Sequence, residues 1–121
     1  RIRTRLYNIM KEKGYKSASY ISSRAFVWKN VKFGEHCFVF EDNTIQPFVE
    51  IGNNVILWSG NHIGHHSKID DNCFISSHVV ISGFCHIHAK TPGGTATCEH
   101  LRTKFLLING WKYRTIISTG T

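Results

Sequence analysis

A strict six-residue period dominates this sequence and limits the folds that it can adopt. Starting at Ile21, every sixth position carries a large apolar side chain, without a gap, as far as Ile87. The fifth position of each hexad carries a smaller side chain, such as Ala25, Cys37 or Val49. An α-helix repeats every 3.6 residues and a half-buried strand every two, so neither explains a period of six. The complete apolar series is Ile21, Val27, Phe33, Val39, Ile45, Ile51, Leu57, Ile63, Ile69, Ile75, Ile81 and Ile87.

A solenoid of short strands with three flat faces does explain this period, because one hexad then covers one face. Three hexads make one coil, and residues i and i+18 lie in neighbouring coils about 4.8 Å apart. The first-position and fifth-position side chains point inward, which places Asn43 and Asn61 in an internal amide ladder. We therefore predict an all-β fold, a left-handed parallel β-helix of about four coils over residues 21–92.

Two segments flank the predicted β-helix domain, which spans residues 17–92. In residues 1–16, Ile2, Leu6 and Ile9 follow a helical spacing that ends near Gly14, so we expect a short N-terminal helix and a linker. Residues 93–121 leave the six-residue register, and their structure stays open. They could form one or two strands, or a helix that caps the last coil. Alternatively, the tail is not a native sequence, for example because of a frame change in the gene.

The composition excludes several classes of protein. The chain has 121 residues and a net charge of +7, but the excess of basic residues lies mainly at the two ends. No run of five like charges occurs, which favours a solvated basic surface over nucleic-acid binding. No apolar run approaches the roughly 18 residues that cross a membrane, and no secretory signal is recognised.

The four cysteines do not form a metal-binding or redox pattern. No Cys-x-x-Cys pair is present, so neither a zinc ribbon nor a redox dithiol is indicated. Cys37, Cys73 and Cys85 all occupy the fifth position of a hexad, where they are expected to be small buried apolar residues. A reducing, cytoplasmic setting is the simplest expectation.

The segment from Ser59 to Gly83 carries further motifs, Ile-Gly-His-His at residues 63–66 and Phe-Ile-Ser-Ser-His at residues 74–78. This segment resembles the bacterial sugar acetyltransferases of the hexapeptide-repeat superfamily. It is most similar to the sialic-acid O-acetyltransferase-like and nucleotide-amino-sugar N-acetyltransferase group. The similarity extends over residues 15–87.

The resemblance implies a homotrimer with active sites in the grooves between neighbouring solenoids. It implies acetyl transfer from acetyl-CoA, as co-substrate, to a hydroxyl or amine of a sugar or nucleotide sugar. The setting would be surface-polysaccharide or glycan synthesis, such as lipopolysaccharide or capsule. It also implies a Rossmann-like domain before the solenoid, of which residues 1–16 look like the last helix.

His65 is the predicted general base. Acyl transfer from a thioester requires an acceptor that loses a proton as it attacks, and a histidine suits that role near neutral pH. Gly83 lies at i+18 from His65, and its missing side chain would let a thioester approach its backbone N–H. The resemblance implies that this N–H stabilises the oxyanion, with Gly83 and Phe84 contacting the cofactor.

Four further residues are predicted to contact the substrate. His66 follows the base and would orient it or bind the acceptor, at a position where the family often has an acid. His78 would line the same groove from an adjacent subunit. Asn61 and His62 are weaker candidates, and Asn61 has the inward orientation as its alternative.

A metal site is the main rival explanation for eight histidines. Comparison of each histidine with its i±18 neighbours places no two of them in one stack, so we expect no metal within a single chain. A site across a trimer axis stays open, as does a γ-carbonic-anhydrase-like solenoid with histidines from several subunits.

A non-catalytic solenoid is the alternative to an acetyltransferase. Similar enzymes continue for several coils past the position of Ile87, and those coils build much of their CoA channel. A truncated chain would then serve assembly or be a remnant. The residues do not distinguish O-acetyl from N-acetyl transfer.

Overall fold

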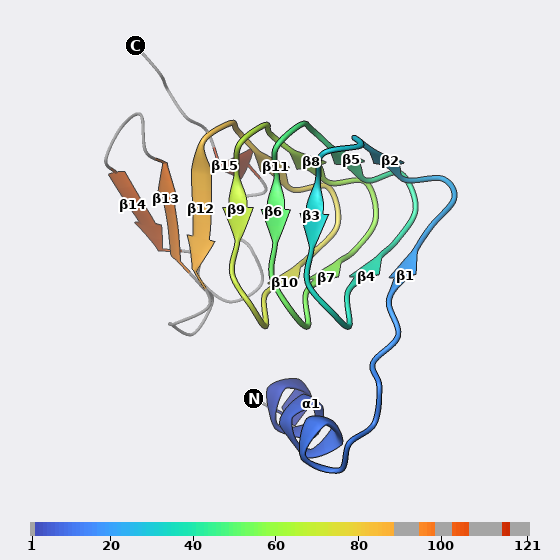
Figure 1. Ribbon diagram of the computed structural model, residues 1–121. Coiled ribbons are helices and arrows are strands. Elements are labelled where there is room, and N and C mark those ends of the chain that lie inside the picture. The colour runs from blue at the N-terminus through green and yellow to red at the C-terminus, as the bar shows by residue number, and fades with distance from the viewer. Residues whose placement is uncertain (1, 89–94, 99–102, 107–114, 117–121) are drawn as a thin grey trace.

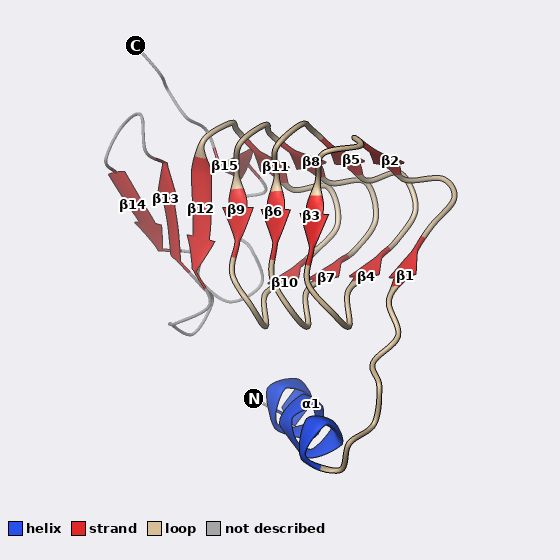
Figure 2. Cartoon of the chain, in the orientation of Figure 1, coloured by secondary structure: helices blue, strands red, loops and turns tan. Residues whose placement is uncertain are grey.

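The computed structural model describes residues 2–88 and the backbone of residues 95–98, 103–106 and 115–116. The chain winds as a parallel β-helix of about four coils, with one helix beside it (Figures 1 and 2). The predicted all-β solenoid is therefore confirmed. Within the described residues, no helix has the length and apolar character needed to cross a membrane.

Three sheets form the sides of the solenoid, and successive strands of one coil belong to different sheets. Sheet A contains β1 (Tyr20–Ile21), β4 (Phe38–Val39), β7 (Ile56–Leu57) and β10 (Phe74–Ile75). Sheet B contains β2 (Phe26–Val27), β5 (Thr44–Ile45), β8 (His62–Ile63), β11 (Val80–Ile81) and β15 (Thr115–Ile116). Sheet C contains β3 (Lys32–Phe33), β6 (Glu50–Ile51), β9 (Lys68–Ile69), β12 (Cys85–His88), β13 (Thr95–Cys98) and β14 (Thr103–Leu106).

The register of the sheets follows the predicted relation between positions i and i+18. Phe38 pairs with Ile56, and His62 pairs with Val80, each in a parallel arrangement. The tail departs from this rule. Strand β13 pairs antiparallel with β12 and with β14, whereas β15 adds to sheet B beside β11. The described parts of the tail are thus strands that extend two sheets of the solenoid.

The core consists of the first and fifth positions of the hexads, as predicted. Ile45, Leu57 and Ile63 are fully buried, and so are the smaller Val49 and Val55. Removing such side chains from water stabilises the fold by about 1.5–3 kcal/mol each. The first coil is less covered, which leaves its side chains partly exposed.

Two asparagines are buried inside the ladder and bind backbone groups of the next coil. The Asn61 backbone N–H donates to Asn43 Oδ1 over 3.2 Å, and the Val79 N–H donates to Asn61 Oδ1 over 2.8 Å. The Asn61 amide nitrogen donates to the Trp58 carbonyl. The structure therefore places Asn61 in the core, the inward alternative, and its amide binds backbone rather than facing solvent.

The three cysteines of the fifth position are also buried, as predicted. Burial raises the pKa of the Cys37 thiol, and it raises the pKa of the Cys73 thiol to about 12. Such thiols stay protonated at neutral pH, so Cys37 and Cys73 are unsuited to act as nucleophiles. Cys85 differs from these two free cysteines, because its sulfur takes part in a disulfide.

Sharp corners join the three sheets. From His36 to Phe84, the fourth position of every hexad has a positive φ, which turns the chain from one face to the next. Asn, Asp and Gly adopt this conformation most readily, whereas other residues adopt it at a cost. The readily turning residues are Asp42, Asn54, Gly60 and Asn72, and the remaining corners carry His36, Phe48, His66, His78 and Phe84. We name the corners by the sheets that they join, so the B–C corner lies between sheets B and C.

The N-terminal helix α1 (Ile2–Glu12) packs on the C–A corner (Figure 1). The Arg3 guanidinium donates to the carbonyl oxygens of Asn54, Asn72 and Cys73. The Tyr7 hydroxyl donates to the Glu35 carboxylate, which also forms an ion pair with Lys11 over 2.7 Å. The predicted short helix is confirmed, and polar contacts hold it against the solenoid.

Candidate functional site

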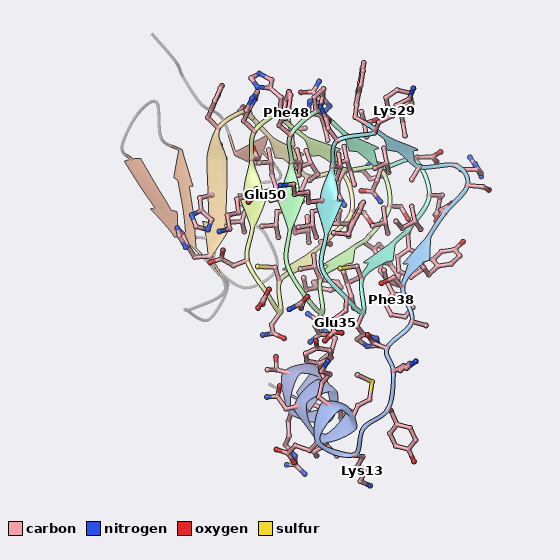
Figure 3. All side chains as sticks on the ribbon, in the orientation of Figure 1. Lys13, Lys29, Glu35, Phe38, Phe48 and Glu50 are labelled. Atoms are coloured by element: carbon pink, nitrogen blue, oxygen red, sulfur yellow. The ribbon has the colours of Figure 1, made fainter. Side chains whose placement is uncertain are left out.

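The B–C corner carries a column of aromatic rings from three successive coils. Phe48, His66 and Phe84 occupy equivalent positions in these coils, and all three have a positive φ. The ring centroids of Phe48 and His66 are 4.8 Å apart, and those of His66 and Phe84 are 4.7 Å apart and nearly parallel, at 8°. Figure 3 shows Phe48 at this corner, away from the corner where Glu35 meets α1. The column holds the His66 imidazole between two flat apolar surfaces.

His65 projects from the same corner and lies against Gly83 of the next coil. A Cβ added at Gly83 would approach the His65 Cε1 and Nε2 atoms to 2.8 Å, so a side chain there would displace the ring. The His65 ring meets the Phe84 ring edge-on at 5.1 Å. Its backbone N–H donates to Gln46 Oε1 over 3.0 Å. The predicted pairing of His65 with Gly83 is present in the structure, at an exposed corner.

The two histidines of this corner also contact each other. His65 Nδ1 lies 3.1 Å from His66 Nδ1, a distance at which one nitrogen donates and the other accepts. When the proton is on His65 Nδ1, the His65 Nε2 atom keeps its lone pair and can accept a proton. His66 therefore has the geometry to fix the tautomer of His65, a role for which an acidic residue is not required.

The backbone around Gly83 is closely packed on its other side. A Cβ on Gly64 would overlap the Gly83 backbone nitrogen and would lie 2.7 Å from the Ile81 carbonyl oxygen. In the described part of the chain, no acceptor is bonded to the Gly83 N–H. Gly83 therefore places its α-carbon against the His65 imidazole and its backbone nitrogen against Gly64.

His78 and His62 lie away from this corner within the chain. His78 belongs to the A–B corner, where its ring lies over Gly60, and a Cβ on Gly60 would approach His78 Nδ1 to 2.6 Å. His62 is half-buried on β8, between Thr44 and Val80 of the neighbouring strands. One chain alone does not bring His78 next to His65.

Gln46 and Phe48 contact the corner histidines but were not among the predicted site residues. Both residues precede the Ile-Gly-His-His element by about one coil. The relation between positions i and i+18 links Phe48 to His66 directly, so the same repeat arithmetic contains the signal. The Gln46 side chain accepts a hydrogen bond from the His65 backbone N–H. This contact depends on the rotamer of Gln46, which the repeat does not specify.

A second polar cluster lies on sheet C. His86 and His88 have ring centroids only 3.8 Å apart. Both imidazoles contact the Asp70 carboxylate. Partial burial raises the pKa of Asp70, but the hydrogen bonds and charges of the two histidines outweigh it, so the net pKa is lowered. The comparison of histidine pairs at i±18 overlooked this cluster, because these histidines alternate along one strand.

Comparison with known families agrees with the architecture. Residues 48–83 match the family model described as bacterial transferase hexapeptide, six repeats. The central part of the ladder therefore consists of hexapeptide repeats. The matched residues include Phe48, His65, His66 and Gly83, whereas Phe84 lies one residue beyond the match. No curated protein matches the chain.

Two solved structures share the fold of the hexapeptide repeat. PerB from Caulobacter crescentus, solved in complex with CoA and GDP-perosamine, has 22% identity and a TM-score of 0.67, over 69% of this chain and 40% of that one. The acetyltransferase domain of PglB from Neisseria gonorrhoeae has 22% identity and a TM-score of 0.70, over 72% of this chain and 42% of that one. The chain thus spans about two-fifths of the length of either.

Proposed function

We propose that this chain is the hexapeptide-repeat part of an acetyltransferase that uses acetyl-CoA and acts on a hydroxyl or amine of a sugar or nucleotide sugar. The observation that carries the proposal is the His65 imidazole lying against Gly83 of the next coil. The likeness to PerB, which was solved with CoA and GDP-perosamine, supports this substrate class. The setting we propose is the synthesis of a surface polysaccharide or glycan.

In the proposed reaction, His65 Nε2 removes the proton of the acceptor hydroxyl or amine as the acceptor attacks the thioester carbonyl. The Gly83 N–H donates to the oxygen that becomes negatively charged in the tetrahedral intermediate. His66 accepts a hydrogen bond from His65 Nδ1–H and so favours the imidazolium. When the intermediate collapses, the C–S bond breaks and His65 returns its proton to the CoA thiolate. Phe84, beside Gly83, is the proposed contact for the CoA chain.

The surface of the solenoid supports a homotrimer. The outward side chains of sheet A are apolar along its whole length, and Tyr20, Trp58 and Phe74 are 50%, 44% and 48% exposed. Sheet B also exposes Phe26 and Trp28. The outward positions of sheet C are instead charged or polar, at Lys32, Glu50, Lys68 and His86.

A ring of three chains would cover sheet A and the exposed aromatic residues of sheet B, because sheet A of one chain would pack against sheet B of the next. Such a head-to-tail interface closes a ring when the rotation is right. Large exposed apolar patches mark interaction sites in soluble proteins. His78 lies where sheets A and B meet and His62 lies on sheet B, so in this arrangement both would approach a neighbouring chain. We propose that they contact the acceptor only in the assembled trimer.

Trp58→Lys tests the trimer, because the lysine places a charge in the aromatic surface of sheet A, where the Trp58 and Phe40 rings are 4.5 Å apart. Light scattering after gel filtration should show single chains for this variant. Lys32→Glu reverses a charge on the polar sheet C and should leave the mass unchanged. A monomeric original chain would contradict the trimer but not the base role of His65.

An acetyl-CoA turnover assay tests the proposed function. The purified chain is incubated with acetyl-CoA and a panel of UDP-, dTDP- and GDP-linked amino sugars and CMP-sialic acid, and thiol release is measured. Calorimetry with CoA measures binding separately. Thiol release that depends on one acceptor supports the proposal. Absence of both thiol release and CoA binding would favour the alternative, a non-catalytic solenoid.

A further inference from the structure

Asp70, His86 and His88 form a compact cluster on sheet C. Asp70 follows β9 directly, and the two histidines lie on β12, the next strand of the sheet. The His86 Nε2 atom lies 2.6 Å from Asp70 Oδ1, and the His88 Nδ1 atom lies 3.2 Å from Asp70 Oδ2. One ligand atom from each residue can be chosen so that all three lie within 4.8 Å of one another.

The fold itself brings these three residues together. Side chains alternate across a strand, so His86 and His88 share the outer face while Cys85 and Ile87 point into the core. The Asp70 backbone N–H donates to the Ile87 carbonyl over 2.9 Å, which fixes the position of Asp70 between the two histidines. The cluster is therefore held by the ladder register rather than by flexible loops.

The cluster is also partly shielded from solvent. The side chains of Asp70, His86 and His88 are 26%, 30% and 26% exposed. The exposed Lys68 pairs with His86 in the strand register. Among the described residues, Lys68 forms no ion pair with Asp70. Each Asp70 oxygen instead contacts one imidazole.

We propose that Asp70, His86 and His88 bind a divalent transition-metal ion, with Zn²⁺ as the best match to two imidazoles and one carboxylate. Ligand atoms about 2.0–2.2 Å from a tetrahedral zinc lie about 3.4 Å from one another. The observed separations of 2.6 and 3.2 Å involve the two different Asp70 oxygens, and one ligand atom from each residue lies within 4.8 Å of the others, so side-chain rotations would bring the three atoms around one ion. Three protein ligands leave the fourth position to water or another ligand.

Metal binding would change which ring nitrogen carries the proton in both imidazoles. In the metal-free cluster, His86 Nε2–H and His88 Nδ1–H donate to Asp70. In the metal-bound cluster, each proton moves to the other ring nitrogen and the freed lone pair binds the ion. A bound ion would link β12 to the residue that follows β9, so it would stabilise the last coil of the ladder. This role is independent of acetyl transfer.

Titration calorimetry with Zn²⁺ tests the proposal on the chain without a histidine tag and after treatment with a chelator. We expect one zinc ion per chain and a higher melting temperature with zinc present. Co²⁺ in place of zinc should give visible absorption bands of a site with nitrogen and oxygen ligands. Asp70→Asn should weaken zinc binding at least tenfold, and His86→Ala combined with His88→Ala should abolish it.

The His65–His66 pair provides the matched control, because its two Nδ1 atoms are only 3.1 Å apart and would be the main competing site. The double variant His65→Ala and His66→Ala should bind zinc as tightly as the original chain. His88→Gln keeps a polar side chain and is a milder change than the double alanine variant. Far-UV circular dichroism checks that each variant folds. No zinc binding by the original chain, or binding lost only with His65 and His66, would overturn the proposal.

Discussion

The imidazole of His65 lies directly over the α-carbon of Gly83, one coil further along the ladder. The space for the ring exists only because residue 83 has no side chain, since an added Cβ would be 2.8 Å from two ring atoms. This relationship can be perturbed from either residue.

Gly83→Ala should lower acetyl transfer strongly while leaving the fold intact. The added methyl group meets the His65 ring, which can rotate away, and no positive φ is found at Gly83. Gly64→Ala is the matched comparison, because its methyl group meets backbone atoms of residues 81–83 that cannot move freely. We expect Gly64→Ala to cost about 1–3 kcal/mol of stability. Equal melting temperatures for the two variants would contradict this account of the corner.

His65→Ala should reduce turnover of a hydroxyl acceptor about 10²–10⁴-fold, the usual contribution of a general base. The acceptor affinity should change little, so the loss should appear in kcat. An amine acceptor that attacks as the neutral base needs less help and should lose less. Steady-state kinetics with both kinds of acceptor checks this, and an unchanged rate with the hydroxyl acceptor would remove His65 from the role.

His66→Glu should retain activity, whereas His66→Phe should lose most of it. A glutamate can accept the hydrogen bond from His65 Nδ1–H, and a phenylalanine can stack between Phe48 and Phe84 but cannot accept that bond. The pair of variants separates ring stacking from tautomer control. If the phenylalanine variant were as active as the original chain, His66 would be only a packing residue.

Asn61→Ala should destabilise the ladder by about 1–3 kcal/mol, because the buried Val79 N–H loses its acceptor. Asn61 is only 1% exposed, so bulk water does not reach the Val79 N–H in the intact ladder. Chemical denaturation measures the change. Asn53→Ala serves as a comparison, since it removes an equivalent bond to Glu35 at a corner that is only partly buried. A smaller loss at Asn61 than at Asn53 would contradict the internal ladder as a source of stability.

Docking of α1 should weaken in acid. Hydrogen bonds from Lys11 and Tyr7 lower the pKa of Glu35 relative to the unfolded chain, and burial together with the bond to Glu35 raises the pKa of Tyr7 to about 12. A carboxylate with a lowered folded pKa stabilises the docked helix above the unfolded pKa. That contribution disappears as the pH falls through the folded pKa. Protection of the α1 amides from hydrogen exchange, corrected for intrinsic rates, should fall below about pH 4. Glu35→Gln should lack this acid step.

The six-residue period is sufficient to predict the solenoid, its three faces and its core. Every coil repeats the same local pattern, so the relation between positions i and i+18 states which residues are neighbours, including His65 and Gly83. The buried cysteines and the inward Asn61 follow from the same rule, because burial depends on position within the hexad.

Only the tertiary structure determines how side chains leave the corners and what packs beside them. The Nδ1 contact of His65 with His66 depends on rotamers, and the docking of α1 depends on polar contacts with Glu35 and Asn54 that have no periodic signal. In the cluster of Asp70, His86 and His88, the two histidines lie two residues apart on the same face of β12, and Asp70 directly follows the neighbouring strand β9. A repeat describes backbone neighbours, whereas these contacts arise from side-chain directions and from segments outside the repeat.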